Sequence, residues 1–260
     1  MTAKIIGCIH LLPLPGSPGY AFNREAIINK ALCELEIYKA AGVDGLIVEN
    51  TSDIPYLKGT VYPETVSMVS IICHEIRKRC NLYLGLQVLA GANSEAISIA
   101  CNTGFDFIRV EGFSFAHIGD EGLIQSCAAE LMRKRAYLRA DHIKVIADIK
   151  KKHASHAITA DLSLVEMARL TEYLEPDGLV ISGFTTGAAP AVADVKSVKE
   201  GVKLPIYVGS GVTRENVFEF SKVSDYLIVG SYFKKDGYWK NELDNNKVCE
   251  FMKLVRSVQP

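Results

Sequence analysis

The sequence predicts an α/β fold, a single (β/α)8 barrel domain that spans residues 1–260. Three observations support this prediction. The chain contains eight short runs rich in Ile, Val and Leu, helix-like segments separate these runs, and the length of 260 residues is near the ~250 typical of this barrel. A doubly wound open sheet is the alternative. Eight strands without a break in composition favour the closed barrel.

The apolar runs have the character of buried parallel strands, because near-continuous apolar stretches are typical of strands covered on both faces. In chain order, the predicted strands lie within residues 4–10, 41–50, 82–88, 103–112, 143–149, 175–183, 204–209 and 223–231. The ends where four of them begin carry Asp44, Asp106, Asp177 and Asp225. We expect these aspartates to serve as turn and capping residues.

The segments between the strands predict helices. One begins at Arg24 and ends at Gly42, and another begins just after Pro63, a residue suited to a helix start. The longest is predicted from Glu121 onward. The preceding loop, residues 112–122, is rich in glycine and aromatic residues and contains His117, so it is a candidate for a mobile lid.

Composition excludes several classes of function. The formal net charge is −1, which gives no general electrostatic reason to bind nucleic acid. No apolar run approaches the ~18 residues of a membrane-spanning helix, so no membrane insertion is expected, and the N-terminus lacks a secretory pattern. The seven cysteines form no Cys-x-x-Cys pair, which predicts reduced thiols, a cytoplasmic or other reducing compartment, and no structural zinc site.

Polar residues gather where the predicted strands end, the region that holds the chemistry in such barrels. Because side chains alternate along a strand, Arg109 shares a face with Glu111, and Asp148 shares one with Lys150. We expect Asp148 and Lys150 to point inward near the mouth of the barrel, and several charged groups at this end imply a shared polar site. The candidate residues at these strand ends are His10, Glu49, Asn50, Gln87, Arg109, Glu111, Asp148, Lys150, Ser182 and Gly183. Lys151 and Lys152 are interpreted as part of a solvated loop.

The last two strands run into similar glycine turns, with Gly209, Ser210 and Gly211 in the first and Gly230 and Ser231 in the second. Glycine lets the backbone approach a ligand closely. A helix is predicted after the first turn with Thr213 as its N-cap, and amides at a helix start bind phosphate. The loops after the seventh and eighth barrel strands are a frequent phosphate site, so bound phosphate or sulfate is expected.

Several long segments in matching order resemble the BtpA family of (β/α)8 proteins. The most specific segments are 5–18, 42–55, 107–113, 147–154, 182–187, 208–217 and 228–239. The family is named after a factor in photosystem I biogenesis, and other members have been described as nucleosidases or sugar-metabolism proteins. This chain departs from the pattern: it has Glu111 where many members have Asn, and its segment 88–93 lacks their basic residue and Asn-Asp pair.

We expect an enzyme acting on a small phosphorylated metabolite, a phosphosugar or nucleotide, by nucleosidase, isomerase or aldolase chemistry. Asp148 or Glu49 would be the general acid or base, Lys150 would stabilise negative charge or form a Schiff base, and His10 would shuttle a proton. Glu111 completes the candidate catalytic set. No cofactor is required by this chemistry.

Other functions stay open. One is a non-catalytic assembly or binding factor that keeps the phosphate site. Another is a hydrolase dependent on a divalent metal, with His10, Glu49 and Asp148, or His153 and His156, as ligands. A homo-oligomer is compatible with the proline-rich segment 10–20, which would serve as a contact surface or a lid.

Overall fold

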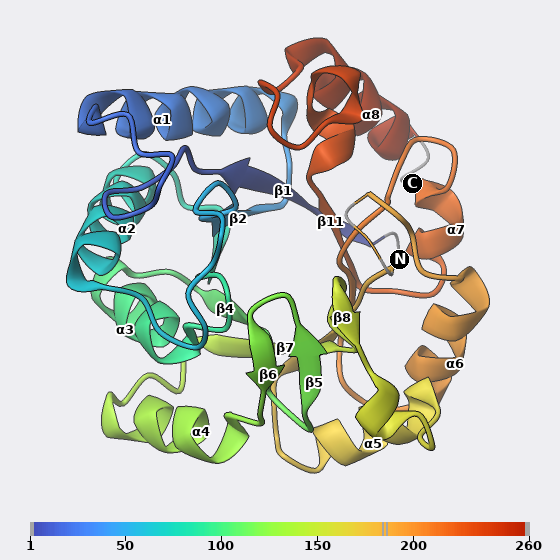
Figure 1. The fold of residues 1–260 in the computed structure, drawn as a ribbon. Coiled ribbons are helices and arrows are strands. Elements are labelled where there is room, and N and C mark those ends of the chain that lie inside the picture. The colour runs from blue at the N-terminus through green and yellow to red at the C-terminus, as the bar shows by residue number, and fades with distance from the viewer. Residues whose placement is uncertain (1–2, 184, 186, 258–260) are drawn as a thin grey trace.

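Eight parallel strands close into a barrel inside a ring of helices (Figure 1). A computed structural model describes residues 3–183, 185 and 187–257, so both ends of the predicted domain, and Phe184 and Thr186 of the segment 182–187, lie outside the described residues. The barrel strands are β1 (Lys4–His10), β2 (Gly45–Glu49), β3 (Tyr83–Gln87), β4 (Phe107–Val110), β7 (Lys144–Ile149), β9 (Gly178–Ile181), β10 (Ile206–Val208) and β11 (Tyr226–Val229). Because β1 pairs with β11, the predicted closed barrel is confirmed and the open sheet is excluded.

Helices alternate with these strands. They are α1 (Arg24–Ala41), α2 (Pro63–Arg77), α3 (Asn93–Thr103), α4 (Ala128–Tyr137), α5 (Leu164–Glu172), α6 (Val192–Gly201), α7 (Val217–Ser221) and α8 (Asn245–Ser257). The predicted limits of the first helix are confirmed, since Gly42 ends α1 in the left-handed conformation at φ 75°. Pro63 is the first residue of α2, as its fixed φ favours.

A second, three-stranded sheet was not foreseen. It contains β5 (His117–Gly119), β6 (Gly122–Ile124) and β8 (Ala154–Ser155), and it lies on the side of α4 and α5 (Figure 1). The helix predicted from Glu121 was therefore wrong at its start: α4 begins at Ala128, and residues 117–124 form a β-hairpin. Gly122, at φ 96°, begins the returning strand of this hairpin, a backbone conformation that a helix cannot contain.

The described residues include three short 3-10 helices as well: η1 (Ala157–Thr159), η2 (Ser231–Phe233) and η3 (Lys235–Gly237). The last two lie in the long connection between β11 and α8. This connection also carries Trp239, the only tryptophan of the chain, which lies at the mouth of the barrel.

The apolar side chains form two buried clusters. The larger lies between strands and helices and contains the outward side chains of β7, which are Val145, Ala147 and Ile149. The smaller fills the interior of the barrel with Phe107, Tyr207 and six other residues. Gly85 on β3 makes room for this filling, because a Cβ atom there would lie 2.0 Å from the Phe107 ring. The interior is thus closed by apolar groups below a polar mouth.

Four aspartates connect pairs of neighbouring strands at the end of the barrel opposite that mouth. Each stands directly before a barrel strand and accepts a hydrogen bond from an amide at the start of the preceding strand. Asp44 accepts from Ile5 at 2.8 Å, Asp106 from Leu84 at 2.8 Å, Asp177 from Val145 at 2.9 Å and Asp225 from Ile206 at 2.7 Å. Arg256, Arg77, Arg135 and Lys199 pair with these carboxylates in the same order. The expected capping role is therefore confirmed, and it recurs at every second strand.

Candidate functional site

A cavity of about 470 Å³ opens at the carboxyl ends of the barrel strands. This volume lies within the range of small-molecule sites. The predicted residues that line it are His10, Glu49, Gln87, Arg109, Glu111, Gly209, Ser210, Gly211, Gly230 and Ser231. Strand ends far apart in the sequence therefore converge on one space.

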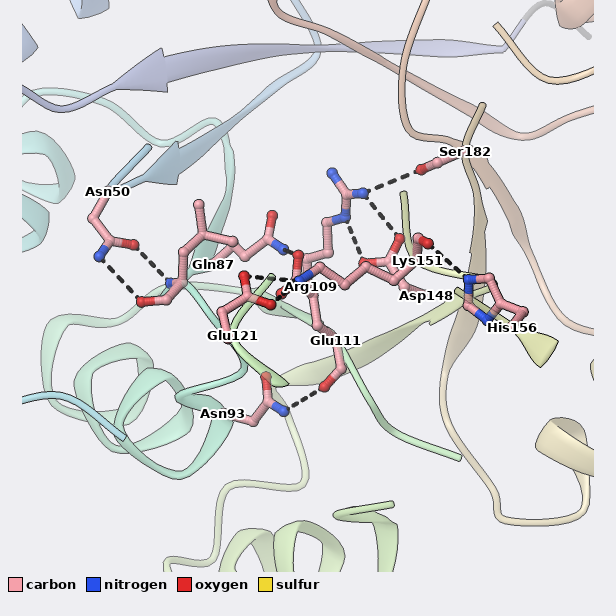
Figure 2. Close-up of polar contacts among 11 residues, drawn as sticks. Asn50, Gln87, Asn93, Arg109, Glu111, Glu121, Asp148, Lys151, His156 and Ser182 are labelled. Carbon is pink, nitrogen blue, oxygen red and sulfur yellow. Dashed lines mark hydrogen bonds and ion pairs between the residues drawn. The ribbon is translucent and has the colours of Figure 1, made fainter. Parts of the chain in front are cut away.

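Arg109 on β4 lies at the centre of the polar network in this mouth. Its Nε and Nη2 atoms donate to the two carboxylate oxygens of Asp148, each at 2.9 Å, and Nη2 also donates to Ser182 Oγ at 3.2 Å (Figure 2). Nη1 lies 3.7 Å from Glu49 Oε1. Burial lowers the pKa of Arg109, but the Asp148 and Glu49 carboxylates raise it, and the net pKa lies above its ordinary value. Asp148 thus serves mainly to hold a permanent positive charge in place.

Glu111 is the carboxyl group best suited to exchange a proton. Its Oε1 accepts from Gln87 Nε2 at 3.0 Å, and its Oε2 lies 3.5 Å from Lys151 Nζ. Burial raises the pKa of Glu111 to about 7, although the Lys151 charge acts in the opposite direction. A group that titrates near neutrality can act as either acid or base.

Lys151 takes the inward position that was predicted for Lys150. Strand β7 ends at Ile149, and Lys150 has a left-handed φ of 49°, so the alternation of side chains stops there. Lys150 Nζ lies 3.5 Å from the Leu162 carbonyl oxygen, and the residue does not line the main cavity. Lys151 is 8 % exposed and contacts both Glu111 and Glu121. The predicted inward orientation of Lys150 and the solvated position of Lys151 are both wrong.

Glu121 connects the β5–β6 hairpin to the barrel mouth. Lys151 Nζ donates to its two carboxylate oxygens at 3.1 and 3.0 Å (Figure 2). Asp120, Glu121, Lys152 and His153 all line the cavity. Residues 117–122 of the segment predicted as a mobile lid thus belong to a hairpin whose turn borders the site.

His10 on β1 faces the cavity as a neutral ring. Its Nδ1 atom lies 3.2 Å from the Trp239 carbonyl oxygen. Burial, reinforced by the positive charge of Lys234, lowers its pKa to about 3. A ring with this pKa holds no second proton near neutral pH, which argues against the predicted proton shuttle.

The first glycine turn is held by contacts between neighbouring loops. Ser210 Oγ donates to the Ala188 carbonyl oxygen at 2.7 Å and accepts from the Gly183 amide at 3.2 Å. Gly211 has φ 69°, and a Cβ atom there would lie 2.1 Å from the Ala189 nitrogen. Part of the glycine pattern is therefore explained by close packing of the loops after β9 and β10.

The helix predicted after this turn starts later than expected. Its N-cap is Asn216, and α7 contains only the five residues Val217–Ser221, so Thr213 is not the N-cap. The Asn216 side chain accepts from the Thr213 amide at 2.8 Å. Within the described part of the chain, the amides of Gly211 and Val212 take no part in the turn's hydrogen bonds. They border the cavity, where they can donate to an anion.

Two predicted candidates have other tasks. Asn50 donates to Asp53 and to the Leu89 carbonyl oxygen and accepts from the Leu89 amide at 2.7 Å, so it fixes the loop after β3. His156 Nε2 lies 2.9 Å from the Lys151 carbonyl oxygen.

Over residues 3–183, 185 and 187–257, no three His, Cys, Asp or Glu side chains form a group that could hold a metal ion. The metal-dependent alternative therefore has no ligand set in this region.

Sequence reasoning missed the three aromatic residues of the cavity. Tyr56, Tyr232 and Trp239 line the site from the loops after β2 and β11. Aromatic residues in irregular loops carry no periodic pattern that predicts their direction. Trp239 ends the resembling segment 228–239, which was the one available signal.

Comparison with known proteins identifies relatives along the whole chain. The BtpA family matches residues 1–257. An uncharacterised mitochondrial protein of Caenorhabditis elegans is 40% identical over 260 residues, with 98% of this chain and 94% of the relative covered. The photosystem I biogenesis protein BtpA of Synechocystis is 33% identical over 252 residues, covering 96% of this chain and 87% of the relative. Thiamine phosphate pyrophosphorylase of Pyrococcus furiosus shares the fold, with a TM-score of 0.61, 11% identity, and 99% of this chain and 97% of that chain covered.

Proposed function

The chain belongs to the BtpA family, and we propose that it is an enzyme that acts on a small phosphorylated metabolite, a phosphosugar or a nucleotide, by acid–base chemistry. One observation carries the proposal: the 470 Å³ cavity joins the two glycine turns to a buried set of ionisable side chains. Taking several charges out of water is unfavourable. Their concentration around an open space therefore favours a role in binding and catalysis over a role in stability.

The phosphate would lie against the turns after β10 and β11. The amides of Gly211 and Val212, together with Gly230 and Ser231 after the neighbouring strand, border this part of the cavity. Lys152 lines the same cavity and supplies positive charge. No divalent metal is needed for this arrangement.

Glu111 would transfer the proton. It is 5 % exposed, its pKa lies near 7 because of burial, and Lys151 contacts the same carboxylate. Arg109, held by Asp148, would stabilise negative charge that develops on the substrate. Isomerase, aldolase and nucleosidase reactions can each use such a set.

A non-catalytic assembly or binding factor is the second candidate. The printed name of the Synechocystis relative, a photosystem I biogenesis protein, favours it. The buried charges at the mouth favour the enzyme, because a scaffold gains nothing from a carboxyl group that titrates near neutrality.

The setting we propose is the cytoplasm or another reducing compartment, as a monomer or homo-oligomer. All seven cysteines are free in the described part of the chain. No helix among the described residues is both long and apolar enough to cross a membrane.

Thermal unfolding in the presence of phosphosugars, nucleotides, inorganic phosphate and sulfate tests the proposal. Ligands that bind the folded state raise its melting temperature. We expect stabilisation by at least one phosphorylated compound, followed by its turnover, and loss of turnover in Glu111→Gln. Stabilisation by a protein partner alone, with none from any phosphorylated compound, would favour the assembly factor.

A further inference from the structure

His10 and Glu49 lie side by side at the cavity wall. No described side chain forms a hydrogen bond with His10 Nε2 or with the Glu49 carboxylate. The two residues end β1 and β2 and lie directly opposite each other in the strand register. Both residues are buried, at 8 % and 6 % exposure, and both line the cavity. His10 Nε2 lies 3.9 Å from Glu49 Oε2, too far for a hydrogen bond.

The cavity-facing nitrogen of His10 is a hydrogen-bond acceptor. A carbonyl oxygen can only accept, so the 3.2 Å contact between Nδ1 and the Trp239 oxygen requires the proton to sit on Nδ1. In the neutral ring the other nitrogen, Nε2, then presents a lone pair. The charge of Lys234 opposes protonation of the ring, so the ring stays neutral and this lone pair stays free of a proton.

Glu49 also lacks donors. Its Oε1 is buried and has no hydrogen-bond partner among the described residues, and the nearest cation, Arg109 Nη1, is 3.7 Å away. Buried carboxylate oxygens are strongly destabilising without donors. Glu49 lines the cavity, so a donor that enters the cavity would stabilise this carboxylate.

The space in front of the pair is open because Gly230 has no side chain. A Cβ atom at Gly230 would lie 3.3 Å from His10 Nε2. Gly230 also belongs to the second glycine turn, so the acceptor pair adjoins the proposed phosphate site. A donor held by His10 and Glu49 would lie a few bonds from the phosphate ester.

We propose that His10 and Glu49 are an acceptor pair for hydroxyl groups, so that the substrate is a polyhydroxylated phosphate ester of the sugar phosphate class. The inference rests on the proposed function for the position of the phosphate. A neutral hydroxyl group satisfies both acceptors. An ammonium donor is disfavoured, because Arg109, Lys151 and Lys152 also line the cavity.

The test compares three probes: D-ribose 5-phosphate, propyl phosphate, which has no hydroxyl group on its chain, and D-ribose. Trp239 is the only tryptophan and lines the cavity, so its fluorescence reports binding, with titration calorimetry as a second readout. We expect wild-type protein to bind ribose 5-phosphate about 10-fold or more tightly than propyl phosphate, since a hydrogen bond to a charged acceptor is strong.

The variant Glu49→Gln keeps the size of the side chain and removes its charge. It should weaken ribose 5-phosphate binding about 10-fold and leave propyl phosphate binding unchanged or tighter. Glu64→Gln, at an exposed position in the first turn of α2, is the matched control and should bind all probes like wild type.

Each outcome decides between the two proposals. Equal binding of the two phosphates by wild type, or a preference that survives in Glu49→Gln, overturns the acceptor pair and leaves the proposed function standing. Binding of ribose with no binding of either phosphate overturns the proposed function and supports the pair. If none of the probes binds, both are overturned. The wild-type comparison decides by itself if Glu49→Gln does not fold.

Discussion

Lys151, two residues beyond the end of β7, forms a bidentate contact with Glu121 of the β5–β6 hairpin, with Nζ at 3.1 and 3.0 Å from the two carboxylate oxygens. The same ammonium lies 3.5 Å from Glu111 inside the barrel. One side chain thereby links the hairpin at the cavity rim to the carboxyl group with the most suitable pKa for proton transfer.

Loss of this link should loosen the hairpin. In Glu121→Gln we expect amide hydrogen exchange in His117–Ile124 to become about 10-fold faster, because a partly buried charged hydrogen bond is lost. Exchange in the barrel strands should not change. The exposed variant Glu130→Gln, on α4, is the control. Unchanged exchange in the hairpin would show that other contacts hold it.

Disruption of the Arg109–Asp148 pair should be strongly destabilising. Arg109→Met leaves the Asp148 carboxylate buried without its two donors, so we expect the free energy of unfolding to fall by about 3–5 kcal/mol in urea titrations. Removal of both charges in Arg109→Met with Asp148→Leu should recover much of the loss. A double variant no more stable than the single one would contradict this account.

Glu111 should make stability depend on pH. Its pKa is about 7 in the folded protein against 4.5 as its ordinary value. Between these values the folded state keeps a proton that the unfolded state releases, so stability falls as pH rises through this window. We expect Glu111 to lower the free energy of unfolding of the wild type by roughly 3 kcal/mol between pH 4.5 and 7. The variant Glu111→Gln should lack this decrease. Urea unfolding at several pH values measures it.

The comparison must be made between variant and wild type, because His10 acts in the opposite direction. Its pKa of about 3 lies below the ordinary 6.5, so its contribution to stability decreases as pH falls from 6.5 toward 3. Lys151→Met offers a second check. The Lys151 charge lowers the pKa of Glu111, so its removal should raise that pKa. The decrease in the free energy of unfolding should then continue to a higher pH than in the wild type.

The four aspartates that precede barrel strands, Asp44, Asp106, Asp177 and Asp225, should contribute to the stability of the fold and not to ligand binding. In Asp106→Asn the Leu84 amide and Arg77 lose a charged acceptor, and we expect a loss of about 1–2 kcal/mol. Ligand affinity at the opposite end should stay at the wild-type value. Asp141→Asn, an exposed position, is the control. A loss of affinity without a loss of stability would contradict this division of roles.

The sequence by itself determined the barrel, both limits of its first helix, the start of its second helix and the ring of aspartates. These features depend on local signals: apolar runs, a left-handed glycine after a helix, and an acidic residue before each of four strands. It also predicted that Asp148 points inward, where it contacts Arg109, because alternation along a strand holds for as long as the strand continues.

Only the tertiary structure decided what lies beyond the strand ends. The left-handed backbone at Lys150 turns its side chain away from the cavity, so Lys151 lines the cavity in place of the predicted Lys150. Residues 117–124 form a hairpin because its two strands pair with each other and β5 also pairs with β8. The tautomer of His10 is set by the Trp239 carbonyl oxygen, 229 positions away in the sequence. Such contacts depend on the path of the loops in space, and no periodicity in a single sequence encodes that path.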